Sequence, residues 1–283
     1  MKKVLFFTFV LLTFVLTDCL SADLQVVVLD VGMGQSVLLV EDGHGILVDT
    51  GLAEYGPHVL SRMKHFGVDT LDYLILSHLH PDHAGGYFQI RASWPDTSVF
   101  DSCSVPEELH LSEQDAFLKL QEGLKNDPLH HCMEAGDELH WKGHRLEILW
   151  PMSMAGTNLN RDSMVLLFTA KQGKTLLIMG DVDKSVERSL QATLEASLQQ
   201  KGVGLYVAGH HAAVDSADPD FLRMLHPQVS IVSVGKDNLL GYPSKKSMAV
   251  LGKYSETTLR TDLNGEICFK LILEKVVPCS VLY

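Results

Sequence analysis

The sequence is short of basic residues, of cysteines and of long apolar runs, and each shortage excludes a class of protein. It contains 23 Lys and Arg against 35 Asp and Glu, so its formal net charge is −12 over 283 residues. An acidic protein does not hold polyphosphate through a broad basic surface, which argues against a processive, non-specific nucleic-acid binder. Bound divalent cations would reverse the sign of the potential locally.

The one long apolar run lies at the start of the sequence. Two lysines precede residues 4–16, which are apolar over a length too short to span a bilayer comfortably and typical of an export signal. We expect residues 1–22 to form this signal, with cleavage after Ala22. A lipoprotein signal that ends before Cys19 is the second interpretation. Residues 23–283 are then expected to form one hydrolase domain that is periplasmic, extracellular or anchored to a membrane through Cys19.

Four further cysteines follow, and none of them lies in a Cys-x-x-Cys pair. In an oxidising compartment an even number permits two disulfides. Pairing of cysteines that are near in sequence would join Cys103 to Cys132 and Cys268 to Cys279, which is one of the three pairings that four cysteines allow. Buried free thiols are the alternative, and we assign no cysteine to a metal.

A cluster of histidines follows the apolar segment 73–77. It reads His-Leu-His-Pro-Asp-His from His78 to His83, and two glycines come after it, so it is expected in a loop at the end of a strand. His78 and His80 project the same way and can hold one ion, whereas Asp82 and His83 point to a second position. Imidazole with carboxylate suits zinc, manganese or iron, and two ions about 3.5–4 Å apart form a hydrolytic pair. A solvated histidine-rich turn is the alternative.

Strand-like and helix-like segments alternate along the rest of the chain. We expect strands at residues 24–29, 36–40, 45–48, 71–76, 145–149, 164–170, 175–179, 205–208 and 229–234. We expect helices at residues 55–66, 112–125, 184–200, 218–225 and 244–254. By itself this alternation predicts a mixed α/β protein.

The order of the motifs resembles that of the metallo-β-lactamase fold, and in particular that of the hydrolase domain of ComEC-type DNA-uptake proteins. The resemblance covers roughly residues 24–273. It rests on the His-x-His-x-Asp-His motif and on the segments 28–36, 46–51, 177–181, 209–211, 233–243 and 260–265. The resemblance implies an αββα four-layer sandwich of two mixed β-sheets with helices outside.

The first ion has fewer ligands than is usual for this fold. The resemblance implies that Asp181 bridges the two ions, although a turn residue or a helix cap is the alternative interpretation. Many members of the fold add a third histidine to the first ion, but Asn160 and Ser163 lie in the corresponding stretch, as in ComEC-like domains. The first ion is therefore left with His78, His80 and Asp181, and water or substrate would complete its coordination.

The second ion is expected to be held by Asp82, His83 and His210. His211 would line the pocket or donate to the substrate, and a surface histidine is the alternative. Asp49 resembles a carboxylate that fixes a ligand imidazole by accepting its other N–H, although a turn residue is the alternative. Two divalent ions are thus the expected cofactors, zinc first and manganese as the alternative.

Several residues differ from the ComEC-like pattern in loops expected to shape the pocket. Ala212 and Ala213 replace Gly-Ser, Tyr242 replaces a histidine and Met33 replaces a glutamine. A tyrosine can donate a hydrogen bond but cannot shuttle protons near neutral pH. Arg161 could meet a phosphate, with an exposed loop arginine as the alternative. These differences weaken the prediction of nuclease activity more than that of the metal site.

The sequence therefore predicts an exported metal-dependent hydrolase, with phosphodiester hydrolysis of extracytoplasmic DNA as the activity that the resemblance implies. Asp82 is expected to orient the attacking water besides binding metal, and His211 is the second candidate catalytic residue. Hydrolysis of a small ester, lactone or β-lactam is one alternative. A non-catalytic binding module that keeps metal for structure is the other.

Overall fold

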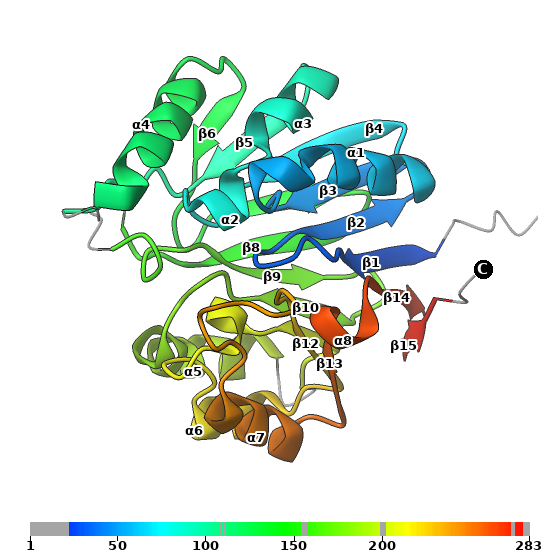
Figure 1. Cartoon of the computed structure of the whole chain (residues 1–283). Coiled ribbons are helices and arrows are strands. Elements are labelled where there is room, and N and C mark those ends of the chain that lie inside the picture. The colour runs from blue at the N-terminus through cyan, green and yellow to red at the C-terminus, as the bar shows by residue number, and fades with distance from the viewer. Residues whose placement is uncertain are drawn as a thin grey trace, which may run out of the picture.

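The computed structural model describes residues 23–107, 109, 111–153, 158–198, 202–272 and 275–279. The predicted export signal, residues 1–22, lies outside this part of the chain. Two mixed β-sheets pack face to face, and helices cover the outer face of each sheet (Figure 1). The predicted αββα sandwich is therefore confirmed.

The first sheet has eight strands in the order β15-β14-β1-β2-β3-β4-β5-β6. Strands β15 to β3 are antiparallel to their neighbours, whereas β3, β4, β5 and β6 run parallel. Because parallel strands end at the same edge of a sheet, the loops that follow β3, β4 and β5 meet there. The strands are β1 (Leu24–Val28), β2 (Val37–Glu41), β3 (His44–Val48), β4 (Thr70–Ile75), β5 (Ser98–Asp101), β6 (His130–Cys132), β14 (Ile267–Ile272) and β15 (Lys275–Pro278).

The second sheet has seven strands in the order β13-β12-β11-β10-β9-β8-β7. Strands β7 to β10 are antiparallel and β10 to β13 are parallel. The loops after β10 and β11 therefore also lie at one edge. The strands are β7 (Glu138–Trp141), β8 (His144–Trp150), β9 (Val165–Thr169), β10 (Thr175–Ile178), β11 (Leu205–Val207), β12 (Val229–Val232) and β13 (Thr257–Arg260).

Helices enclose the two sheets from opposite sides. Those on the first sheet are α1 (Gly56–His65), α2 (Pro81–Ala84), α3 (Tyr87–Ser93) and α4 (Leu111–Lys125). Those on the second are α5 (Lys184–Leu198), α6 (Pro219–Leu225) and α7 (Lys245–Tyr254). The short elements are η1 (Ala53–Tyr55), η2 (Gly209–Ala212) and α8 (Thr261–Asn264). Apolar side chains form one core between the sheets and one beneath each helical layer.

The predicted strands and helices are confirmed to within a few residues at their ends. The elements that the sequence analysis missed are short or half exposed, such as β6, which reads His-His-Cys, and β13, which has no buried residue. Their hydrophobic pattern is too weak to stand out because the neighbouring strand supplies most of their contacts. Disulfides join Cys103 to Cys132 and Cys268 to Cys279, which is the pairing of cysteines near in sequence.

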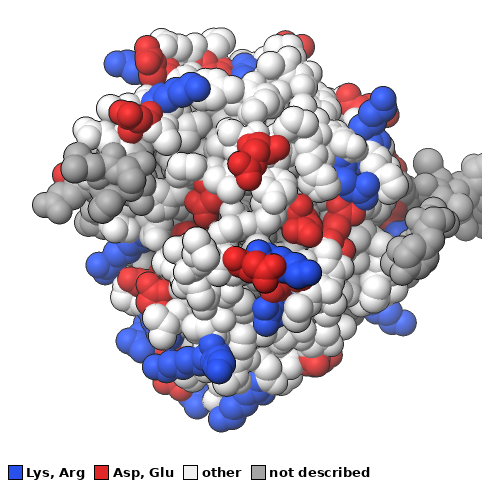
Figure 2. Space-filling view, viewed as in Figure 1, with Lys and Arg blue, Asp and Glu red and all other residues white. Residues whose placement is uncertain are grey.

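The charges are scattered over the visible surface. Figure 2 shows acidic and basic side chains interspersed, and neither sign forms a continuous patch on this face. On this face, any affinity for an anionic polymer would have to come from local features.

Candidate metal centre

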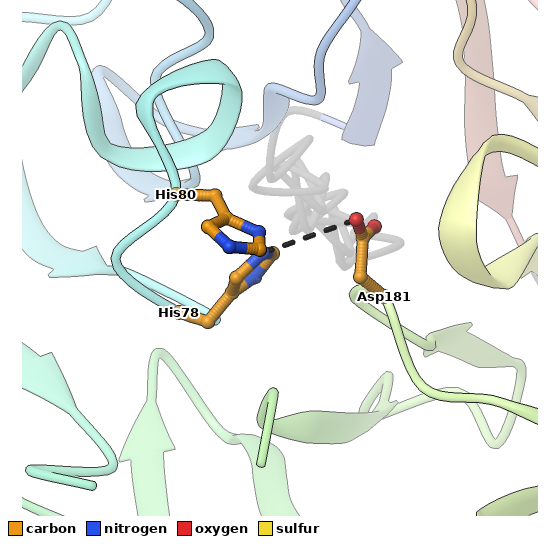
Figure 3. A group of neighbouring side chains, drawn as sticks. All are labelled: His78, His80 and Asp181. Atoms are coloured by element: carbon orange, nitrogen blue, oxygen red, sulfur yellow. Dashed lines mark hydrogen bonds and ion pairs between the residues drawn. The ribbon is translucent and has the colours of Figure 1, made fainter. Parts of the chain in front are cut away.

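Loops from both sheets meet at one edge of the sandwich, and they carry the residues that the sequence analysis singled out. His78 and His80 lie between β4 and α2, and α2 itself carries Asp82 and His83. Asp181 follows β10 in the second sheet. Figure 3 shows His78 and His80 reaching from the loop before α2 toward Asp181 on the opposite side. The fold therefore brings together side chains from segments about 100 residues apart.

One group of candidate ligands consists of His78, His80 and Asp181. His78 Nε2 lies 3.0 Å from His80 Nδ1 and 3.9 Å from Asp181 Oδ2. His78 is 2% exposed and Asp181 is 4% exposed. Two imidazole nitrogens and a carboxylate oxygen thus converge in a buried position.

A second group consists of Asp82, His83 and His211. His211 Nε2 lies 3.3 Å from Asp82 Oδ2 and 3.4 Å from His83 Nε2. Asp181 lies between the two groups, because its Oδ1 is 3.1 Å from His83 Nε2 while its Oδ2 faces His78. The position of this carboxylate suits a bridge between two cations.

Hydrogen bonds orient the imidazoles of the second group. His83 Nδ1 lies 2.8 Å from Asp49 Oδ2, and His211 Nδ1 lies 2.7 Å from the carbonyl oxygen of Ser233. Each Nδ1 therefore donates its hydrogen, so in the neutral imidazole the lone pair lies on Nε2, which faces the carboxylates of Asp82 and Asp181. This arrangement is how proteins present imidazole to a metal.

The donor set fits a divalent cation. The lone pairs on the two Nε2 atoms face carboxylate oxygens at 3.1–3.9 Å. Asp181 Oδ1 is buried and makes no hydrogen bond of good geometry with any residue that the structure describes. Acceptors that face one another in a buried space repel unless positive charge lies between them, as protons or as metal ions. Imidazole and carboxylate are ligands of zinc, manganese and iron.

The pKa values of these histidines and carboxylates also indicate that the centre favours positive charge. Burial alone would lower the pKa of His83, but nearby carboxylates, Asp181 above all, raise it well above its usual value. The pKa of His211 is raised for the same reason. Burial would raise the pKa of Asp181 and Asp82, yet the neighbouring histidines lower both. Burial, together with the charge of His83, lowers the pKa of His78 well below its usual value, so His78 keeps a lone pair for a cation.

Strained backbone holds the residues of the second sheet in place. His210, His211 and Ala212 have φ values of 47°, 50° and 58°, in the left-handed region that non-glycine residues avoid. Gly180 precedes Asp181 with φ of 54°, and a Cβ there would lie 2.8 Å from Ser163 Cβ. Such conformations persist where the surrounding structure imposes them, and they cluster at functional sites.

The turn after β11 places its two histidines differently from the sequence analysis. The structure groups His211, and not the expected His210, with Asp82 and His83. His210 lies at the edge, where its Nδ1 is 3.2 Å from Asp215 Oδ1 and its Nε2 is 4.0 Å from Asp181 Oδ2. The left-handed turn decides this, because it directs the two consecutive side chains to different places.

The loops that differ from the ComEC-like pattern surround the centre. Tyr242 Oη lies 3.4 Å from His210 Nε2, and its ring stacks on His211 with ring centroids 6.3 Å apart. Ala212 and Ala213 are buried, and the partly buried Met33 packs against the core of the second sheet. Tyr242 is therefore the one of these residues that brings a polar side-chain atom to the edge of the centre, next to His210.

Residues 158–163, where many members of the fold have a third histidine, are hydrogen-bonded to Asp181. Ser163 Oγ accepts a hydrogen bond from Asp181 N–H at 3.1 Å, and Asn160 Nδ2 lies 3.3 Å from His210 Nε2. Helix α5 is capped by Asp183, whose Oδ1 accepts from Ser185 and Val186, so Asp181 is not the cap. The side chain of Asp181 is therefore available to the centre.

A cavity of about 350 Å³ opens beside the centre. Asp181 and His210 line it. The other lining residues come from the loop between β8 and β9 and from the segments after β10 and η2, and they are Asn158, Asn160, Arg161, Asp183 and Asp215. Asp82 is 27% exposed at its side chain, more than Asp181 at 5%, so the centre is open to solvent on one side. A substrate can therefore reach the candidate ligands.

Sequence reasoning missed the residues that orient the ligands. Gln35 Nε2 and Ser77 Oγ both donate to Asp49 Oδ2 at 2.8 Å, and Ser233 and Asp215 accept from the two histidines after β11. These four residues carry no metal-ligand spacing in the sequence. The glutamine does lie within the motif 28–36, which is the signal that could have found it.

Comparisons with known proteins agree with this geometry. A family model described as the metallo-beta-lactamase superfamily matches residues 29–155. Recombination protein 2 of Haemophilus influenzae is 28% identical over 249 residues, which are 86% of this chain and 28% of that protein. Competence protein ComA of Neisseria gonorrhoeae is 30% identical over 247 residues, 87% of this chain and 32% of that protein. ComE operon protein 3 of Bacillus subtilis is 27% identical over 271 residues, 89% of this chain and 34% of that protein.

A solved structure shows the same fold. The metallo-beta-lactamase fold protein YhfI from Bacillus subtilis aligns with a TM-score of 0.55 at 12% identity, covering 88% of this chain and 100% of that chain. This chain spans about a third of the length of the curated relatives that it matches. It therefore contains a metallo-β-lactamase domain that is similar to one part of these recombination and competence proteins.

Proposed function

We propose that the protein is an exported, metal-dependent phosphodiesterase that hydrolyses DNA. The observation that carries the proposal is the arrangement of two ligand groups around Asp181, beside a solvent-open cavity that Arg161 lines. The similarity to recombination and competence proteins supports DNA as the substrate. Two neighbouring ligand groups suit a two-ion hydrolytic site, which nucleases and phosphatases use and which aminopeptidases use as well.

Each ligand group would hold one divalent ion, zinc or manganese, with Asp181 between the two. The ions would be held by His78, His80 and Asp181 on one side and by Asp82, His83 and His211 on the other. When bound, such ions lower the pKa of water and stabilise the charge that develops during hydrolysis. His211 thereby takes the ligand position for which the sequence analysis expected His210.

The residues around the ions would position the reactants. Asp82 is the candidate to orient the attacking water, because its carboxylate is the more exposed of the two acidic ligands. Arg161 would hold a phosphate oxygen through its guanidinium group, which matches phosphate geometry better than an ammonium does. The indole N–H of Trp150 donates to the carbonyl oxygen of Arg161 at 2.7 Å, so the backbone of this loop is fixed.

Two features support export. The two disulfides are typical of proteins from oxidising compartments. Residues 1–22 have the pattern of an export signal. We propose a periplasmic, extracellular or Cys19-anchored protein whose hydrolase domain comprises residues 23–283.

One observation favours a second candidate function, hydrolysis of a small ester, lactone or β-lactam. Asp183 and Asp215 line the same cavity as Arg161 and would repel a polyanion. Their effect on DNA would depend on how far bound divalent ions neutralise them. The experiment that tests the proposal therefore has to include uncharged substrates.

The test is metal analysis of the mature protein, followed by assays with single-stranded DNA, double-stranded DNA, a phosphodiester reporter and a lactone panel in Mn²⁺ or Zn²⁺. We expect cleavage of DNA and of the reporter, and loss of both in Asp181→Asn. Arg161→Ala should raise KM for DNA more than it lowers kcat. Arg223→Ala is the matched control, since Arg223 pairs with Asp220 on the exposed face of α6.

Other outcomes would contradict the proposal. Turnover of lactones without cleavage of DNA would favour the second candidate function. If the metal-loaded protein hydrolyses nothing and His80→Ala unfolds the protein, the metal has a structural role and the module is non-catalytic.

A further inference from the structure

The first ligand group is incomplete. Metal ions of the kinds that imidazole and carboxylate bind take four or more ligands, yet His78, His80 and Asp181 supply three. The stretch 158–163, which has no histidine, passes close to this group, since Asp181 N–H donates to Ser163 Oγ at 3.1 Å. A further ligand would have to come from this stretch or from solvent.

Asn160 has a polar atom in need of a partner. Within the part of the chain that the structure describes, its Oδ1 is buried and has no hydrogen-bond partner. Asp181 Oδ1 is also buried, and its near neighbour is His83 Nε2 at 3.1 Å. Asn160 and Asp181 line the same cavity. Leaving a buried carbonyl oxygen unsatisfied costs about 1–3 kcal/mol, so such an atom usually has a partner such as an ordered water or an ion.

The neighbouring histidine determines which atom of the amide is free. His210 Nδ1 lies 3.2 Å from Asp215 Oδ1, so the imidazole donates its hydrogen there and Nε2 must accept. Asn160 Nδ2 lies 3.3 Å from this Nε2 and can donate to it, as can Tyr242 Oη at 3.4 Å, whereas the amide oxygen cannot. The amide is therefore oriented with its nitrogen toward His210 and its oxygen away from it.

The same imidazole nitrogen connects Asn160 with the first ligand group. His210 Nε2 lies 4.0 Å from Asp181 Oδ2, the oxygen that faces His78. The backbone supports this placement, because Ser163 N–H donates to the carbonyl oxygen of Asn160 at 3.1 Å. The turn that carries Asn160 is thus tied through Ser163 to the residue that the two groups share.

We propose that Asn160 gives its amide oxygen to the ion held by His78, His80 and Asp181. His210 and Asp215 are then positioning residues that hold the amide in this orientation. The inference rests on the proposed two-ion centre and is independent of the substrate. It assigns a role to His210, which lies beside the centre without joining either ligand group.

The proposal changes the expected metal preference. With Asn160 the first ion has two nitrogen and two oxygen ligands, whereas a histidine in its place would give three nitrogens and one oxygen. Carbonyl and carboxylate oxygens suit manganese, and imidazole suits zinc. The first site should therefore prefer Mn²⁺ over Zn²⁺ more strongly than a variant with histidine at position 160.

The experiment measures metal binding and does not depend on hydrolysis. The metal-free full-length mature protein is titrated with Mn²⁺, and free Mn²⁺ is followed by electron paramagnetic resonance. Zn²⁺ competition is followed by calorimetry. We expect the wild type to bind two ions, and Asn160→Ala to keep one while its affinity for the other falls about tenfold or more. Asp215→Ala should weaken the same ion by a smaller factor, and Asn160→His should shift that site toward Zn²⁺.

Asn158→Ala is the matched control. Asn158 lines the same cavity, but its Oδ1 already accepts a hydrogen bond from Arg161 N–H at 3.2 Å. This variant should bind both ions as the wild type does. Wild-type affinity for both ions in Asn160→Ala would overturn the proposal. A wild type that binds no ion would overturn the two-ion centre as well, whereas altered binding in Asn160→Ala without any DNA cleavage would leave the inference standing and refute the proposed function.

Discussion

Replacing Asp49 by asparagine would test how the second ligand group is oriented. Asp49 is 0% exposed, and its carboxylate accepts four hydrogen bonds. Oδ1 accepts from Ser77 N–H at 2.7 Å. Oδ2 faces three donors at 2.8 Å, namely Gln35 Nε2, Ser77 Oγ and His83 Nδ1. The negative charge therefore orients His83 as well as stabilising the loop.

An asparagine of nearly the same size must place an NH2 group where one of these oxygens now lies. If the NH2 group takes the place of Oδ2, the Gln35 amide can flip and the Ser77 hydroxyl can rotate. His83, however, must move its hydrogen from Nδ1 to Nε2. A protonated Nε2 cannot bind a cation. If the NH2 group takes the place of Oδ1, the buried Ser77 N–H loses its acceptor, which costs about 1–3 kcal/mol.

We therefore expect the affinity of Asp49→Asn for one of its two ions to fall about 10–100-fold, the usual cost of losing a group that orients a ligand. The free energy of unfolding should fall by about 1–3 kcal/mol. Calorimetric metal titration measures the first effect and urea denaturation the second. Asp30→Asn is the control, because Asp30 Oδ1 accepts a turn hydrogen bond from Gly32 N–H at 3.3 Å. A folded Asp49→Asn protein that binds both ions as tightly as the wild type would refute the reasoning.

Three further predictions concern stability. Burial raises the pKa of Glu187 from 4.5 to about 7, so the folded state keeps a proton that the unfolded state has released. The contribution of Glu187 to the free energy of unfolding is greatest below pH 4.5 and falls by about 3 kcal/mol as the pH rises to about 7. Urea denaturation across this pH range should show that Glu187→Gln lacks this decrease. Parallel profiles of the wild type and the variant would contradict the assignment. Replacing Cys103 and Cys132 together by serine opens a link of sequence separation 29 and should cost about 3–4 kcal/mol in denaturation experiments. A reductant should destabilise the wild type by more than this, because it also opens the Cys268–Cys279 disulfide. Phe168 is 1% exposed and lies between the sheets, so Phe168→Ala should lower the free energy of unfolding by about 3–5 kcal/mol. Phe88 is 39% exposed, so Phe88→Ala should lower it far less. Equal losses in the two variants would contradict the burial argument.

Much of the fold could be predicted because its strands carry local patterns. Strands β2, β3 and β10 read as apolar runs bounded by turns, and the order of the motifs between them pointed to the sandwich. The strands at or near the sheet ends, such as β6, β13 and β15, are short and partly exposed. Their pairing depends on a neighbouring strand, and for β13 and β15 that neighbour is distant in sequence or was itself missed.

Some of the candidate ligands could likewise be predicted from the sequence, and others could not. His78, His80, Asp82 and His83 could be proposed from the sequence alone, because four residues of ligand type within six positions lie close together wherever the loop lies. The choice between His210 and His211 could not, because both follow the same strand and a left-handed turn separates their side chains. The orientation of Asn160 was equally hidden, since it depends on His210, fifty positions further along the chain. Local sequence determined which chemical groups are available, and only the packing of loops from both sheets decided which atoms face one another.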